Sequence, residues 1–311
     1  MNKLQVEIGD VVPREWSISS TENRIWVKRT PVLSRAARIF TLGSCFAEEI
    51  RRELAGIGFQ VLPQYHAPYD PHLVYAHRIE ANHTNHYHTF SIRQELEKAT
   101  GKWRQADDDY WEIPDHIWKG EAPIYQDPYR RAIYARTLKD IRAVTRQIDQ
   151  DIADGLARAD AFIITLGLVE VWRKKDNGLM AGAGPGWDFG GGKGKLAFHF
   201  ATFPDNYSNV LESISIIRGL HPDAPIVLTV SPIAISKTRT DVGCVVANNE
   251  SKSILRAVAG QIVRDVPNVY YFPSFEIFNY SEAARWMDGR HVIQPVLDLI
   301  TSSFITAFKA D

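Results

Sequence analysis

Two short groups of residues near opposite ends of the chain carry the side-chain types needed for nucleophilic catalysis. Gly43, Ser44 and Cys45 form one group, and Asp288 and His291 form the other. A thiol or hydroxyl becomes a strong nucleophile when a histidine accepts its proton, and a carboxylate three residues before that histidine can hold the imidazole in one tautomer. Each pattern alone also fits a plain structural role. Together they indicate covalent catalysis.

The Gly-Ser-Cys group lies where a strand is expected to pass directly into a helix. Residues 39–42 are an apolar, β-rich run that Gly43 interrupts, and from Phe46 onward apolar residues recur at helical spacing. The first helical turn has backbone N–H groups without an intrahelical partner, so a thiolate or an oxyanion placed there is stabilised. The structural alternative makes Ser44 an N-cap and Cys45 a small buried apolar residue.

Composition narrows the classes of protein that need to be considered. The 311 residues are 45% hydrophobic and carry a formal net charge of −1, which offers no electrostatic footprint for nucleic acid or an anionic membrane. Two cysteines, Cys45 and Cys244, are too few for a disulfide framework. The N-terminus has no signal-like pattern, and no apolar run of about 18 residues occurs. We therefore expect a soluble, cytoplasmic protein that requires no cofactor.

The remaining pattern predicts an α/β domain. Residues 1–35 are interpreted as an N-terminal extension and residues 36–311 as the domain, with a histidine- and aromatic-rich insertion at about 64–130, after the second strand. Helices and strands then alternate, which favours a parallel sheet covered on both faces, with ligands at the carboxyl ends of the strands. The expected helices are 91–99, capped by Ser91 or Thr89, then 130–159, 208–220, 248–265 and 296–308; the expected strands are 161–166, 226–230 and 269–272; and 178–194 is expected to be a glycine-rich loop.

The sequence resembles the GSCFA-domain family, which is grouped with the SGNH (GDSL-like) hydrolases. The family takes its name from the motif found here at residues 43–47, and further matches occur at 163–172, 228–232, 271–277 and the Asp288/His291 pair. The resemblance covers about residues 38–295. It implies a flavodoxin-like three-layer α/β/α sandwich and an acyl-ester site.

This resemblance leaves two nucleophiles open. SGNH enzymes carry Gly-Asp-Ser, and in register the nucleophilic serine falls on Cys45, which we favour; the looser alternative keeps serine chemistry at Ser44. His291 would then be the general base and Asp288 its orienting partner. The backbone N–H of Cys45 is expected to stabilise the oxyanion, and the other candidate oxyanion or substrate-binding residues are Gly43, Gly167, Glu170 and His88.

One of these positions departs from the SGNH pattern. The block that usually reads Gly-x-Asn-Asp is Gly167-Leu-Val-Glu170 here, and an ionised glutamate cannot donate a hydrogen bond. His88, within the insertion, is the candidate replacement donor. A metal site at His83, His86 and His88 is the competing interpretation, but no cysteine or clear carboxylate completes a ligand set.

The function expected from the sequence is acyl transfer by a Cys/Ser-His-Asp mechanism, as an esterase or as an O- or N-acyltransferase, with an acylated carbohydrate as one substrate class. The aromatic residues between Trp103 and Tyr129 suit sugar stacking but equally suit packing of the insertion. The alternative is a non-catalytic carbohydrate-binding or scaffold protein that keeps the fold. We expect a small-molecule or carbohydrate partner, no nucleic acid and no membrane; the oligomeric state is left open.

Overall fold

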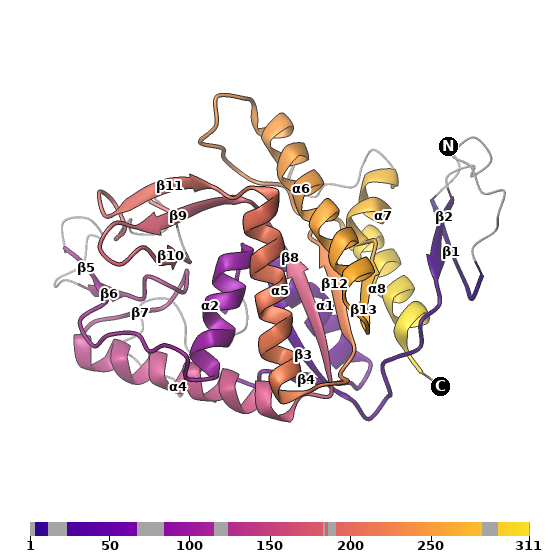
Figure 1. The fold of residues 1–311 in the computed structure, drawn as a ribbon, viewed down its shortest axis with the longest axis horizontal. Coiled ribbons are helices and arrows are strands. Elements are labelled where there is room, and N and C mark those ends of the chain that lie inside the picture. Colours follow the sequence, from indigo (N-terminus) through magenta and orange to yellow (C-terminus); the bar gives the residue numbers. More distant parts are fainter. Residues whose placement is uncertain are drawn as a thin grey trace.

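A five-stranded parallel sheet forms the centre of the molecule (Figure 1). The computed structural model describes residues 4–11, 24–66, 84–114, 124–182, 184–185, 191–281 and 292–310. Because all five strands run in the same direction, their carboxyl ends meet at one edge, where ligands bind in sheets of this kind. In the order β13-β12-β8-β3-β4, the strands are Val269–Phe272, Ile226–Val230, Ala161–Leu166, Arg38–Gly43 and Gln60–Leu62.

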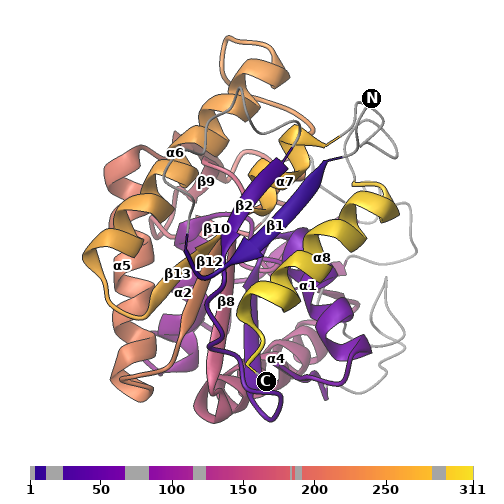
Figure 2. The ribbon, with the colours of Figure 1, turned by 90° about the vertical axis from the view of Figure 1, so that its right-hand side faces the viewer.

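Helices cover both faces of this sheet. Alternate residues of a strand point to opposite faces, so Phe40 and Leu42 join one apolar core whereas Ile39 joins the other. The helices on the Phe40 side are α2 (Thr89–Ala99), α4 (Leu138–Arg158), α5 (Phe203–Leu220) and α6 (Cys244–Asp265). Those on the Ile39 side are α1 (Cys45–Gly56), α7 (Ser274–Tyr280) and α8 (Gln294–Phe308), and Figure 2 shows α1 beside α8. The predicted three-layer α/β/α sandwich is confirmed.

The part of the chain that the structure describes also contains three small sheets. A parallel pair, β1 (Gln5–Gly9) and β2 (Arg24–Lys28), lies against α8, and the chain after it is fastened there by the bond from Thr30 N to Ala307 O, 2.7 Å. The antiparallel sheet β5-β6-β7 comprises Trp111–Ile113, Ile124–Gln126 and Tyr134–Ala135. The antiparallel sheet β10-β9-β11 comprises Met180–Ala181, Glu170–Lys174 and Leu196–Phe200. The division into an extension and a domain with an insertion stays a prediction.

The expected helices begin at other residues than predicted: α2, α5, α6 and α8 begin two to five residues earlier, and α4 begins eight residues later. For α4 and α2 a capping side chain is the local cause. The helix expected from residue 130 begins at Leu138, because the Thr137 side chain accepts a hydrogen bond from Asp140 N and caps it. The residues just before it form β7, which pairs with β6. Helix α2 is capped by His88, whose ring accepts from Ser91 N, and not by Ser91 or Thr89. Part of the expected glycine-rich loop is strand β10.

A buried ionic network joins α2 to α4. The guanidinium of Arg130 is fully buried and lies 2.5 Å from Glu95 Oε1, on α2, and 2.5 Å from Asp149 Oδ1, on α4. Asp127 lies 3.7 Å from the same guanidinium. Burial raises the pKa of Glu95, but Arg130 and Lys98 outweigh that effect and lower it to about 2. Glu95 therefore stays ionised at neutral pH, and Arg130, which contacts both Glu95 and Asp149, fixes α2 against α4.

Replacing Arg130 by methionine should lower the free energy of unfolding by about 3–5 kcal/mol, because Glu95 would stay buried without the cation that most lowers its pKa. Urea unfolding at pH 7 measures this. The matched control is Arg146→Met in the exposed pair with Asp107, which should cost less than about 1 kcal/mol. Equal losses in the two variants would contradict the importance of the buried network.

Candidate active site

The turn after β3 depends on a glycine. Gly43 has a φ of +142°, and a Cβ atom there would lie 2.3 Å from the carbonyl oxygen of Thr165, on the neighbouring strand β8. Without a side chain, the backbone can approach β8, and Ser44 N donates to Thr165 O at 3.3 Å. Helix α1 then begins at Cys45. The predicted succession of strand, tight turn and helix is confirmed, and Gly43 shapes this turn.

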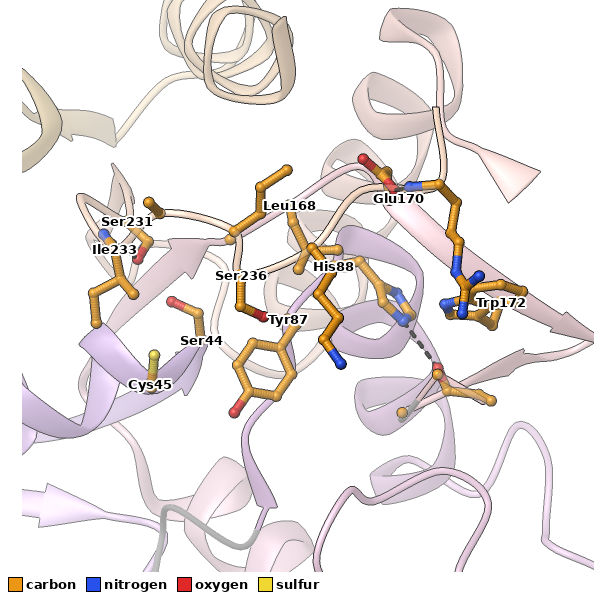
Figure 3. Close-up of a pocket in the computed structure, with 18 of the residues that line it drawn as sticks. Ser44, Cys45, Tyr87, His88, Leu168, Glu170, Trp172, Ser231, Ile233 and Ser236 are labelled. Atoms are coloured by element: carbon orange, nitrogen blue, oxygen red, sulfur yellow. Dashed lines mark hydrogen bonds between the residues drawn. The ribbon is translucent and has the colours of Figure 1, made fainter. Parts of the chain in front are cut away.

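Ser44 and Cys45 both line a cavity of about 210 Å³ at the carboxyl edge of the sheet (Figure 3). Ser44 occupies the N-cap position of α1 but makes no side-chain capping bond. Its hydroxyl is buried and has no hydrogen-bond partner among the described residues. Cys45 is partly buried and forms no disulfide. Ser44 therefore occupies the N-cap position without making the capping hydrogen bond. Its buried hydroxyl oxygen faces the cavity.

A segment of the predicted insertion lies across the strand ends and closes one side of this cavity. We call residues 85–88 the strap. His86 N donates to Gly43 O at 2.7 Å, and Leu168 N donates to Tyr87 O at 2.8 Å. A Cβ atom on Gly167 would lie 2.4 Å from that same Tyr87 oxygen and 3.1 Å from Ser44 Cβ. Gly167 is thus required for the strap to pass so close to the turn at Ser44 and Cys45.

The backbone carbonyl of Gly167 accepts a hydrogen bond from a buried lysine. Lys252, on α6, is almost completely buried and donates from Nζ to Gly167 O at 2.6 Å. This bond joins α6 to the loop after β8, and Lys252 also lines the cavity. The sequence pattern gives no signal for Lys252, because a lysine within an amphipathic helix is ordinarily exposed.

Glu170 lies in the cavity wall, but both of its carboxylate oxygens are occupied. Oε1 accepts from the hydroxyl of Thr238 at 2.6 Å, and Oε2 accepts from the backbone N–H of Arg239 at 2.8 Å. Glu170 thereby fastens the loop that follows β12 over the cavity. Its position agrees with the expectation of a residue near the site, and its contacts are those of an acceptor.

His88 is also fully engaged. Its Nδ1 accepts from Ser91 N at 3.0 Å, and its Nε2 lies 3.0 Å from Ala181 O, which can only accept, so Nε2 carries the proton. Burial lowers the pKa of His88 to about 4, which keeps the ring neutral. The prediction that His88 donates to an oxyanion would require its bond to Ala181 O to break.

The rest of the cavity combines apolar walls with cations at the mouth. Exposed Lys237 and Arg239 come from the loop after β12, and the guanidinium of Arg239 lies 5.6 Å from the centre of the Trp172 ring. Ser231, the first residue after β12, also lines the cavity. The apolar lining residues are Leu168, Trp172, Ala181, Ile233 and Ile235.

Asp288 and His291 lie outside the described residues, so their predicted roles stay predictions. Val292, the next residue along the chain, packs against the same apolar cluster as Cys45. His83 lies outside the described residues as well. Among the residues that are described, no group of three His, Cys, Asp or Glu side chains is arranged to hold a metal ion.

Comparison with known proteins identifies the family. A sequence model described as the GSCFA family matches residues 38–304. The chain belongs to the GSCFA family. No curated protein matches this GSCFA protein. No helix among its described residues has both the length and the apolar character needed to cross a bilayer.

One solved structure with some likeness to this GSCFA protein is the salicylyl-acyltransferase SsfX3 from a tetracycline biosynthetic pathway. The identity is 19%, the match covers 50% of this chain and 42% of that chain, and the TM-score is 0.27. The matched region therefore spans less than half of the acyltransferase. A likeness this distant carries no inference about fold or activity.

Stability should fall as the pH decreases from about 6.5 to about 4. Burial lowers the pKa of both His86 and His88 from 6.5 to about 4, so within this window the unfolded chain binds more protons than the folded protein. The lowered pKa of each histidine should reduce the free energy of unfolding by on the order of 3 kcal/mol at pH 4. Urea midpoints measured between pH 7.5 and pH 4.5 test this expectation.

His88→Asn supplies the comparison for that measurement. Asparagine keeps a capping oxygen for Ser91 N but does not titrate. The variant should therefore lose less stability on acidification than the wild type, whatever the difference in stability between the two proteins at pH 7.5. Parallel pH profiles for the two proteins would show that His88 does not contribute.

Proposed function

We propose that this GSCFA protein is an acyl-transfer enzyme, either an esterase or an acyltransferase, with Cys45 as nucleophile, His291 as general base and Asp288 as the residue that orients His291. The observation that carries the proposal is the nucleophile turn itself. Ser44 and Cys45 stand at the N-terminus of a 12-residue helix, face one cavity, and include a buried hydroxyl without a partner among the described residues.

The location of Cys45 suits thiolate chemistry. It is the first residue of α1, where unpaired N–H groups and the positive end of the helix dipole favour a negative sulfur. His291 would take the thiol proton, the sulfur would attack the acyl carbonyl, and the oxyanion would collapse as the alcohol leaves with that proton. The acyl group is then held as a thioester until water, a hydroxyl or an amine attacks it.

Ser44 remains the alternative nucleophile, since its hydroxyl also faces the cavity. The substrate class is open within acyl esters. The insertion aromatics favour packing over sugar recognition, because Trp103 contacts Tyr129 edge-on and donates to Gln94 O. Trp172, by contrast, lines the cavity and offers an apolar surface to an acylated carbohydrate or another acyl substrate.

The test is the pH dependence of Cys45 alkylation by iodoacetamide, followed by mass spectrometry, with exposed Cys244 as the internal reference. Cys45 should react with an apparent pKa well below about 8.5, and His291→Ala should remove that advantage. Turnover of p-nitrophenyl acetate should fall at least 100-fold in Cys45→Ala and remain unchanged in Cys244→Ala.

Several results would contradict the thiol mechanism. One is that Cys45 does not react with iodoacetamide at any pH while the protein stays folded. Another is loss of turnover in Ser44→Ala but not in Cys45→Ala, which would make Ser44 the nucleophile. If neither variant nor His291→Ala alters turnover, the non-catalytic binding or scaffold role is the better explanation.

A further inference from the structure

The cavity that contains Ser44 and Cys45 has an exposed arginine at its other end. Arg239, and Lys237 two residues before it, belong to the loop after β12, and both line the cavity. The Arg239 guanidinium lies 5.6 Å from the centre of the Trp172 ring. Figure 3 shows Trp172 on the far side of the cavity from Ser44 and Cys45. A group bound to Arg239 therefore lies away from the sulfur and the hydroxyl that could react.

The charges of these two side chains are not neutralised by ion pairs. Within the described part of the chain, neither Lys237 nor Arg239 forms one. Glu170 is the one carboxylate among the described residues that line the cavity, and its oxygens accept from the neutral Thr238 hydroxyl and Arg239 N–H. Two cations and one carboxylate give this region a positive charge, although the whole chain has a formal net charge of −1. A cavity lined in this way attracts an anionic ligand.

The loop that carries the two cations is held in place by hydrogen bonds at two points. Glu170 accepts from the backbone N–H of Arg239, and Asn248 Oδ1, on α6, accepts from Ile235 N at 3.1 Å. The Trp172 ring adds a cation–π contact to the Arg239 guanidinium. A guanidinium stacked on a ring keeps its N–H edge available, and that planar edge matches two oxygens of a carboxylate or phosphate.

We propose that the acyl substrate of this cavity carries an anionic group, a phosphate or a carboxylate, which Arg239 and Lys237 bind while the ester lies at Ser44 and Cys45. This inference rests on the proposed function and names its substrate class. The apolar walls of the cavity would contact the part of the substrate that joins the anion to the ester. An uncharged acylated sugar would leave both cations without a partner.

Calorimetric titration with three small probes tests the preference for an anion. Hexyl phosphate and hexanoate each end in an anion, whereas 1-hexanol has a similar chain and no charge. The wild type should bind at least one anionic probe about 10-fold more tightly than 1-hexanol, because hydrogen bonds between charged groups are the stronger ones. The anionic probe that binds more tightly identifies the group as phosphate or carboxylate. Added NaCl should weaken binding of the anionic probes only.

Arg239→Gln should lower the affinity for the preferred anionic probe by about 10-fold, and Arg239→Lys, which keeps a cation, should lower it less. The matched control is Arg173→Gln. Arg173 is exposed and adjacent to Trp172 on β9, but it does not line the cavity, because neighbouring residues of a strand point to opposite faces. This variant should keep the wild-type affinity. Urea midpoints show whether each variant is folded.

Two results would overturn the proposal. One is that folded wild-type protein binds neither anionic probe more tightly than 1-hexanol. The other is an equal loss of affinity in Arg239→Gln and Arg173→Gln, which would indicate general attraction to a positive surface and not recognition in the cavity.

Binding and turnover together separate this inference from the function on which it rests. If Cys45→Ala abolishes ester turnover but the wild type shows no preference for an anionic probe, only the charged substrate is wrong. If the preference is found but no variant of Cys45, Ser44 or His291 alters turnover, the proposed function is wrong and the cavity is a binding site for an anionic ligand.

Discussion

The close approach of backbone to backbone at the carboxyl edge of the sheet is the constraint on which the site depends. Gly43 lies against Thr165, and Gly167 lies against Tyr87, at separations that leave no room for a Cβ atom. These two contacts bring the end of β3, the end of β8 and the strap into one layer. Side chains that are distant in the sequence then share one cavity. A methyl group at either glycine would force the layer apart.

Most polar side chains in this layer are hydrogen-bonded to other groups of the protein, and these bonds hold the layer together. The His88 ring is hydrogen-bonded to two backbone groups, and the Lys252 ammonium donates a hydrogen bond to Gly167 O. Glu170 holds the loop after β12 with both oxygens. Beneath the strap, Arg130 and its carboxylates fix α2 to α4. The exception at the turn is the Ser44 hydroxyl, which is buried and unpartnered among the described residues.

The hydrogen bonds of the polar side chains distinguish residues that build the cavity from residues that could take part in a reaction. His88 and Glu170 were reasonable candidates for the site, because histidine and glutamate side chains often take part in catalysis. Their bonds show that they position the walls of the cavity. Ser44 and Cys45 face the cavity, which combines apolar walls with exposed cations.

The sequence by itself determined the sheet, the layers and the turn between β3 and α1. Apolar runs and helical spacing are local patterns, and the Gly-Ser-Cys motif joins adjacent residues, so no distant contact is needed to predict them. Helix starts were less predictable, because Thr137 and His88 cap helices that apolar spacing placed elsewhere. Tertiary structure alone decided what His88, Glu170, Tyr87 and Lys252 contact. Their distant partners lie 44 to 93 residues away, and spacing along a chain does not encode which distant group a polar side chain will meet.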